Sequence, residues 1–394
     1  MAAASPTKTQ RAFAFAGLTG LSFALGAPAG FLLWLMLSVA YALCDLAWKG
    51  IGAASGWALF PLCACCAGGV CIGLWNARFK SAPLPFDQVM AQVKREGGYT
   101  VRRPFAAAVS FFLPIAAGGA VGPEAGLMGM VAAGCTWVGT RLRSFAARCG
   151  LQPDAAATRP FLTPWPRRIV YAAGIAGAFA GIAVYRALLP GGMALPRFAA
   201  PGDCCVQWIA WIALGALVGW LLVLLYKGCV RATKRIAAAF GEHLVAKTTV
   251  CGLVLGAAAL ALPYVLFPGT QQFDAIASSW SAMGAAALLA TGVLKTCLVA
   301  FCLNMGWSGG PYLPLVFCGA VSGYGLAAAL GADPAVCVCA VVCSLMGAFV
   351  GKFPGAFLFM LVLFAPHGIL IAALCTAAGC LLPQPKGWKA PARR

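Results

Sequence analysis

The sequence predicts an all-α polytopic membrane protein, built as an inverted repeat with broken, tilted helices. Of its 394 residues, 62% are hydrophobic and 9% are charged, whereas soluble domains carry about 25% charged residues. Apolar runs of membrane length follow one another along the chain. Two of these runs are interrupted by glycine and proline at corresponding places in the two halves, which is the pattern of transporters with a site near the bilayer midplane.

About ten hydrophobic runs meet or approach the length that a membrane-spanning helix needs. They are Phe13–Leu46, Ala53–Ala77, Phe105–Thr140, Ile169–Leu189, Val206–Tyr226, Val250–Phe267, Met283–Leu303, Leu313–Leu330, Val336–Val350 and Ala356–Leu382. We expect one membrane domain over residues 1–394, with inverted halves at roughly 12–190 and 205–382. The first run is long and follows Lys8 and Arg11, so we expect a membrane element rather than a signal peptide. We expect no soluble regulatory domain, because little polar chain follows Leu382.

The formal net charge is +19. Basic residues fall mostly in the connections between apolar runs, as the positive-inside rule predicts, and both termini are basic. We therefore expect a multi-pass protein of a bacterial-type inner membrane with both termini in the cytoplasm. The alternative is that the surplus charge raises the anion concentration at the mouths of a pathway. Nucleic-acid binding is not expected, because no basic stretch is interleaved with aromatics in a soluble module.

The 19 cysteines do not indicate a metal site. Most lie inside apolar runs, where cysteine packs as a small hydrophobe, and neither of the two histidines has a partner at ligand spacing. An intramembrane enzyme would need a catalytic constellation. The chain has no His-Glu-x-x-His motif, no aspartate-rich cluster and no evident Ser/His pair at membrane depth. We expect no catalytic residues, no metal and no cofactor.

The stretch Gly118–Leu127 interrupts an apolar region with glycines, a proline and one carboxylate. An ionisable residue at membrane depth costs at least ~2.5 kcal/mol, so Glu124 is a functional candidate. Irregular backbone at that depth is tolerated where it is buried in protein or lines a cavity. The alternative is that Glu124 only caps its own helix as a first-turn acid. The residues of interest are Gly118, Gly119, Gly122, Pro123, Glu124, Ala125 and Gly126.

A second broken stretch, Gly306–Pro314, follows about half a chain later. Each stretch comes after an apolar run and opens another helix, expected over Glu124–Val138 and Leu315–Leu330. Proline suits the first turn of a helix, and the free N–H groups of two helix N-termini favour an anion. The residues of interest here are Gly309, Gly310, Pro311, Tyr312, Leu313 and Pro314.

At these residues the chain resembles the CLC superfamily of anion channels and anion/proton antiporters. Gly122–Gly126 falls where the family has Gly-Arg-Glu-Gly-Pro, and Gly310–Pro314 falls where it has Gly-x-Phe-x-Pro. Arg168–Ala183 is similar to its small-residue helix, Gly347–Pro354 to its late helix break, and Ser81–Pro85 to its Gly-Ser-Gly-Ile-Pro loop. The resemblance implies a homodimer with one anion pathway per subunit. It also implies a glutamate gate that competes with the anion and, in the antiporters, carries the proton.

In this register Glu124 is the gate, with Pro123 in place of the motif's arginine. A second register, which matches Gly122 and Pro123 to the final Gly-Pro of the motif, would put Val121 at the gate. We prefer the first register, because it keeps the acid between small residues. The positions that the resemblance places around the anion are Gly122, Pro123, Ala125, Tyr312, Leu313 and Ala82.

Departures from the family bear on the identity of the ion. Ala82 stands where chloride-selective members have serine, and it is not the methionine of the fluoride-exporting branch either. Tyr312 replaces the phenylalanine of the second motif. No acid lies near Arg186–Leu188, where chloride/proton antiporters have an internal glutamate, and this suits a fluoride-type member or a channel. Lys295, inside an apolar run, either snorkels to an interface or adds positive potential to the pathway.

The sequence therefore predicts transport of a halide anion, chloride or fluoride, across the lipid bilayer in exchange for protons, with Glu124 as a proton-linked gate. A passive chloride channel is the alternative. The two differ in whether an anion gradient drives protons uphill, and in whether Glu124→Gln abolishes that coupling.

Overall fold

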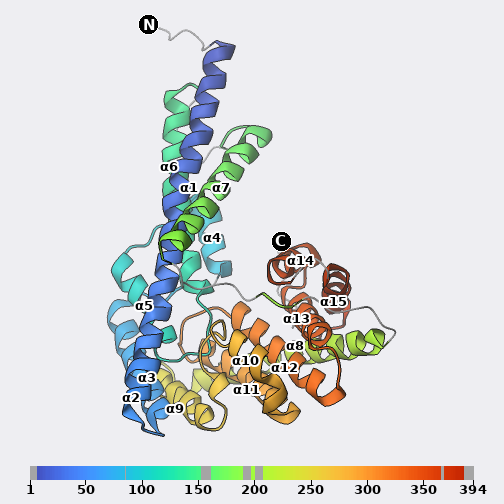
Figure 1. Ribbon diagram of the computed structural model, residues 1–394. Coiled ribbons are helices and arrows are strands. Elements are labelled where there is room, and N and C mark those ends of the chain that lie inside the picture. Colours follow the sequence, from blue (N-terminus) through green and yellow to red (C-terminus); the bar gives the residue numbers. More distant parts are fainter. Residues whose placement is uncertain are drawn as a thin grey trace. The chain divides into compact units, whose positions relative to one another are not determined.

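The computed structural model describes residues 7–84, 86–151, 161–189, 197–199, 207–364 and 368–385, so Pro85 lies outside the described residues. The described chain is a succession of helices joined by turns (Figure 1). Within it, seven helices are long and apolar enough to cross a membrane. The prediction of an all-α polytopic membrane protein is confirmed.

The elements are α1 Lys8–Asp45, η1 Leu46–Gly52, α2 Ala53–Ser55, α3 Phe60–Phe79, α4 Phe86–Glu96, α5 Pro104–Ala116, α6 Glu124–Arg148, α7 Pro164–Leu188, α8 Trp208–Ala239, α9 Leu244–Ala261, η2 Pro263–Val265, α10 Phe273–Met283, α11 Ala285–Asn304, α12 Tyr312–Leu330, α13 Pro334–Val350, α14 Phe353–Leu363 and α15 Ile369–Leu381.

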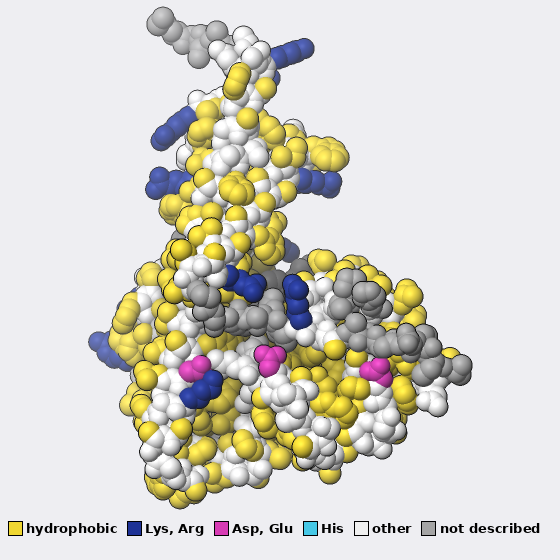
Figure 2. Space-filling model, viewed as in Figure 1, with side chains coloured by type: hydrophobic (Ala, Val, Ile, Leu, Met, Phe, Trp, Pro, Cys, Tyr) yellow, Lys and Arg dark blue, Asp and Glu magenta, His cyan; other side chains and the backbone are white. Residues whose placement is uncertain are grey.

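The surface has the character of a protein that faces lipid. Hydrophobic side chains dominate the face shown in Figure 2, and acidic side chains are few. Large apolar side chains such as Phe179, Leu358 and Leu374 are exposed on α7, α14 and α15. Soluble monomers rarely expose contiguous apolar patches beyond a few hundred Å². The exposed apolar residues therefore fit contact with lipid tails.

Helix boundaries depart from the apolar runs in several places. The helix of α1 continues through η1, which is π-helical. The helix expected over Glu124–Val138 extends to Arg148. The turns that follow Val138 contain arginines, so they are helical although they are not apolar. No helix was expected over Phe273–Met283, since Asp274 and the serines of α10 dilute its hydrophobicity.

The chain forms two compact units. The first comprises Met1–Leu43, Pro83–Ala108 and Ala125–Met193, and the second comprises Cys44–Ala82, Val109–Glu124 and Ala194–Arg394. The division into inverted halves remains a prediction.

In the first unit, α1 and α7 approach so closely that only glycine fits between them. A Cβ added at Gly177 would lie 2.1 Å from the carbonyl oxygen of Phe23, and one at Gly181 would lie 1.9 Å from that of Ala27. Small residues allow membrane helices to approach in this way. The glycine- and alanine-rich run of α7 is thus explained by helix packing.

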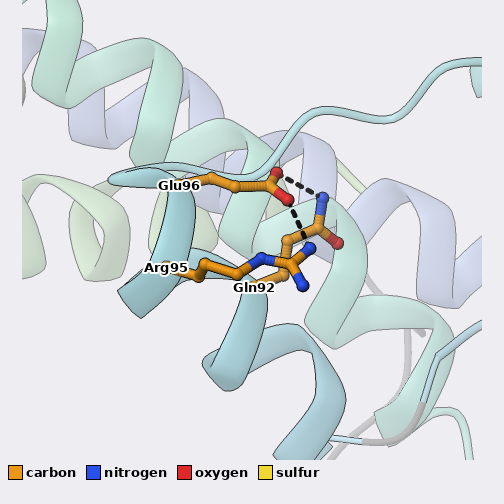
Figure 3. A network of polar contacts seen from close by, with 3 residues as sticks. All are labelled: Gln92, Arg95 and Glu96. Atoms are coloured by element: carbon orange, nitrogen blue, oxygen red, sulfur yellow. Dashed lines mark hydrogen bonds and ion pairs between the residues drawn. The ribbon is translucent and has the colours of Figure 1, made fainter.

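The polar helix α4, also in the first unit, ends in an exposed network (Figure 3). Arg95 Nη2 lies 2.7 Å from Glu96 Oε1, and Gln92 Nε2 donates to Glu96 Oε2 at 2.9 Å. These bonds hold the pKa of Glu96 below its ordinary value. Exposed ion pairs of this kind stabilise a fold little. We therefore regard α4 as a connecting helix with a solvated face.

In the second unit, α3 packs against α9 through glycines on both helices. A Cβ at Gly69 would lie 2.4 Å from the carbonyl oxygen of Thr248, and one at Gly252 would lie 2.1 Å from that of Cys65. The innermost helices are α12 and α13, which are apolar all round and buried along most of their length. Such helices belong to the interior of a membrane bundle. Their burial fixes the start of α12, where the candidate site lies.

Candidate functional site

The first broken stretch lies between α5 and α6. At the end of α5, the N–H of Gly118 bonds the carbonyl of Ile115 at 3.1 Å, and the N–H of Gly119 bonds that of Pro114 at 2.8 Å. Gly118 has a φ of +88°, a conformation that favours glycine. A Cβ at Gly118 would also lie 2.6 Å from the ring of Trp48. Both conformation and space therefore require glycine at this position.

The second broken stretch, between α11 and α12, is built in the same way. Gly306 has a φ of +92°, and the N–H of Trp307 bonds back to the carbonyl of Cys302 at 3.0 Å. The Trp307 side chain is fully buried, and its Nε1 donates to the carbonyl of Thr248 at 3.0 Å. This tryptophan anchors the stretch to α9.

The two stretches are joined backbone to backbone. The N–H of Gly122 donates to the carbonyl of Gly310 at 2.7 Å, and the N–H of Gly310 donates to the carbonyl of Gly122 at 2.8 Å, forming an isolated antiparallel bridge. Each glycine is followed by a proline, and a helix begins at the next residue, Glu124 in α6 and Tyr312 in α12. The bridge therefore brings the first residue of α6 to the N-terminus of α12.

Glu124 lies across this junction. Its Oε1 accepts the N–H of Leu313 at 2.6 Å. Its Oε2 is buried and has no hydrogen-bond partner among the described residues. A Cβ at Gly122 would lie 2.0 Å from Oε2, and a Cβ at Gly310 would lie 2.2 Å from it. The carboxylate thus occupies a space that exists because Gly122 and Gly310 lack side chains; we call this space the glycine cradle.

The electrostatics of the cradle suit an anion. The first N–H groups of a helix have no partner within the helix, and the helix dipole places partial positive charge there. A carboxylate that accepts a short bond from such an N–H is a charge-assisted ligand. The carboxylate of Glu124 therefore lies where a small anion would bind to the N-terminus of α12.

Aromatic rings line the other side of Tyr312. Its ring meets that of Phe349 edge to face, with centroids 5.2 Å apart, and that of Phe359 at 6.5 Å. Phe349 also contacts Tyr226 of α8 at 5.7 Å. The sequence did not point to Tyr226, because no local motif marks it. Phe349 lies in the predicted stretch Gly347–Pro354, but only the packing of α8 and α13 brings it and Tyr226 to α12.

The structure thus brings together Glu124, Gly122, Gly310 and Leu313 of the predicted residues. Gly309 packs against Val121, with a distance of 2.5 Å between an added Cβ and the Val121 Cβ. Val121 is fully buried. Val121 is thus a packed core residue, and the register that places Glu124 at the gate remains a prediction.

The remaining predicted residues lie around these. Pro123, Ala125, Gly126 and Pro314 are buried and form the connections into α6 and α12. Ala82 is not part of this group. It is exposed in the connection after α3, and the hydroxyl of its neighbour Ser81 hydrogen-bonds that of Ser110 at 2.8 Å.

The expectation that Lys295 snorkels to an interface is wrong. Its side chain is completely buried, and Nζ donates to the carbonyls of Tyr264 and Leu266 at 2.8 Å each. A 20-residue helix spans about 30 Å, so a lysine in the middle of α11 is too deep for its side chain to reach either end. That central placement was the signal in the sequence that distinguished the two interpretations.

Known proteins resemble this chain in part of its sequence and in its fold. Residues 205–382 match the family model described as "Voltage gated chloride channel". Three solved structures share the fold over nearly the whole chain. A CLC-type fluoride/proton antiporter has a TM-score of 0.67 and 16% identity, covering 93% of this chain and 94% of its own. The family match over residues 205–382 and the shared fold support membership of the CLC superfamily. A slow cyanobacterial Cl⁻/H⁺ antiporter has a TM-score of 0.67 and 14% identity, covering 92% of this chain and 94% of its own.

The third structure, a eukaryotic CLC transporter, has a TM-score of 0.63 and 16% identity, covering 95% of this chain and 72% of its own. No curated protein sequence matches at a significant level. At these identities the structural likeness shows the CLC fold alone. The family match over residues 205–382 and the apolar helices show an integral multi-pass membrane protein, and the family match supports anion transport.

Proposed function

We propose that this CLC protein exchanges a small halide anion for protons, with Glu124 as the gate. The observation that carries the proposal is the position of its carboxylate. One oxygen accepts the N–H of Leu313 at the start of α12, and the other lies in the glycine cradle without a hydrogen-bond partner among the described residues. The protein's own carboxylate occupies an anion site.

The same geometry supplies a means of opening. An ionised carboxylate is attracted to the N-terminus of α12, whereas a protonated one loses most of that attraction. Oε2 has no donor to lose, and the walls of the cradle are two glycines, so the side chain can leave at the cost of a single hydrogen bond. An incoming anion would then take its place, and the proton would move with the side chain.

Fluoride is the ion that we propose first, and chloride is the alternative. Two features favour fluoride: Ala82 replaces the central serine of chloride-selective relatives, and no acid lies near Arg186–Leu188. The structural neighbours include both a fluoride/proton and a Cl⁻/H⁺ antiporter.

We further propose a homodimer in a bacterial-type inner membrane with both termini in the cytoplasm.

The test is efflux from liposomes that contain the purified protein, recorded with fluoride, chloride and pH electrodes. Exchange predicts that anion efflux carries protons into the vesicles, and that fluoride gives the larger response. A passive channel, the second candidate, predicts anion efflux with no proton movement once the membrane potential is clamped. Absence of any anion flux would refute both functions.

A further inference from the structure

We propose that Lys295 is a positioning residue that holds the first broken stretch, and with it the Glu124 carboxylate, in place. It acts through the loop of residues 262–272, which lies between Lys295 and Gly118. The proposal depends on the proposed function only for the role of the positioned carboxylate in transport. The positioning itself is a matter of contacts that can be tested separately.

The ammonium group of Lys295 is fully engaged inside the protein. Nζ donates to the carbonyls of Tyr264 and Leu266 at 2.8 Å each and to Gln272 Oε1 at 3.3 Å. The ring of Phe317 lies under it, with 3.9 Å between Nζ and the centroid. These partners use all three N–H donors of a lysine, so the group has none left for an anion. Lys295 therefore does not bind the transported ion directly.

The loop that Lys295 holds is strained. Phe267 has a φ of +61°, a conformation that is costly for a residue with a Cβ and persists only where neighbours impose it. The carbonyls that Lys295 binds are those of Leu266, the residue before Phe267, and of Tyr264. A buried ammonium bound to these carbonyls explains how the loop keeps this conformation.

The strained residue in turn holds the start of the first broken stretch. The N–H of Phe267 donates to the carbonyl of Gly118 at 3.1 Å. The Phe267 ring meets Trp48 edge to face at 5.0 Å, and Trp48 Nε1 donates to the carbonyl of Ala116 at 2.8 Å. Gly118 is thus fixed on both sides, four residues before Gly122 of the cradle. A continuous set of contacts runs from Lys295 to the segment that carries Glu124.

Its role in holding the loop of residues 262–272 explains why Lys295 lies at this depth although its polar partners are neutral. A buried charge is tolerated only when its donors are satisfied, and here they are satisfied by two carbonyls of the loop and by the Gln272 side chain. A neutral side chain of similar length would fill the space and release the loop. The expected consequence is a cradle that no longer holds the carboxylate in one position.

The test is a double-mutant cycle between Lys295→Met and Glu124→Ala, which removes the side chain from the cradle, read as the anion concentration that gives half-maximal flux. If Lys295 acts through Glu124, Lys295→Met changes this concentration about fivefold to tenfold in the wild-type background, the worth of one hydrogen bond. In the Glu124→Ala background the change shrinks to less than about twofold. Equal changes in both backgrounds would overturn the proposal. The matched control is Thr291→Val on the same helix, a buried residue whose hydroxyl bonds only its own turn, and it should have no effect.

Hydrogen–deuterium exchange of the purified protein tests the positioning without reference to transport. Lys295→Met should speed exchange in residues 262–272 and also in 114–124, while α13 stays protected as in the wild type. Unchanged protection of 114–124 would overturn the proposal even if the protein proves not to move anions. If Lys295→Met does not fold, Gln272→Leu replaces it in both experiments. That variant removes one of the three acceptors, and it should give the same changes at smaller size.

Discussion

Replacing Gly122 by alanine tests the glycine cradle directly. The added Cβ would lie 2.0 Å from Glu124 Oε2 and 2.6 Å from both Oε1 and Cδ of the same side chain. Gly122 is not among the glycines with positive φ, so its backbone accepts alanine without strain. All three nearest atoms belong to a flexible carboxylate. The side chain of Glu124 therefore moves, and the backbone does not.

The size of the effect follows from the bond that is lost. Once displaced, Glu124 can no longer accept the N–H of Leu313, which it now does at 2.6 Å. A hydrogen bond to a charged group contributes about 1.5–3 kcal/mol, which corresponds to about a 10- to 150-fold loss in occupancy of the cradle by the carboxylate. Transport by Gly122→Ala should then be nearly independent of pH and carry few protons per anion.

The assay is anion flux and proton flux from liposomes over a range of pH, with wild type and Gly134→Ala as references. Gly134 lies on the same helix as Glu124, and an added Cβ there has no heavy atom within 4 Å. That control should behave as wild type in both fluxes. If Gly122→Ala keeps the pH dependence and the coupling ratio of the wild type, the reasoning about the cradle is refuted.

Substitutions at three further positions have expected effects that can be measured. Glu124→Gln keeps an acceptor at the start of α12 but cannot carry a proton, so anion flux should persist without proton flux; coupled proton flux in this variant would contradict the gate. Tyr312→Phe keeps the ring contacts with α13 and α14 and should transport as wild type, whereas Tyr312→Ala should change the anion preference; equal behaviour of the two would exclude a role for the ring. Gly252→Ala places a Cβ 2.1 Å from the Cys65 backbone oxygen and should destabilise the α3–α9 pair by about 1–3 kcal/mol, visible as a lower unfolding temperature than that of Gly139→Ala.

Much of the fold was predictable because the bilayer imposes simple requirements. Apolar runs predicted most of the long helices, and the Gly-Pro breaks predicted where α6 and α12 begin. The limits were equally physical. Apolarity alone gave no sign that α6 extends to Arg148 or that α10 exists, because helices can continue through polar residues when neighbours or water satisfy them.

At the site, local chemistry identified the residues but not their partners. The lone carboxylate of Glu124 and the glycines beside it were evident from the sequence. That Gly310 would form the opposite wall of the cradle depended on a backbone bridge between residues far apart in the chain. Tyr226 carried no motif, and the stretch Gly347–Pro354 gave no sign that its Phe349 would pack against Tyr312. The role of Lys295 needed its three acceptors, two of which are main-chain carbonyls that no sequence pattern displays.

Proton movement driven by an anion gradient is the most direct test of the proposal that Glu124 couples the two ions. Vesicles loaded with fluoride and placed in fluoride-free buffer at equal pH would be followed with a pH electrode, wild type beside Glu124→Gln. Coupled exchange predicts proton uptake by the wild-type vesicles against the gradient that develops, and none by the variant. Fluoride efflux from wild-type vesicles with no proton uptake would contradict it.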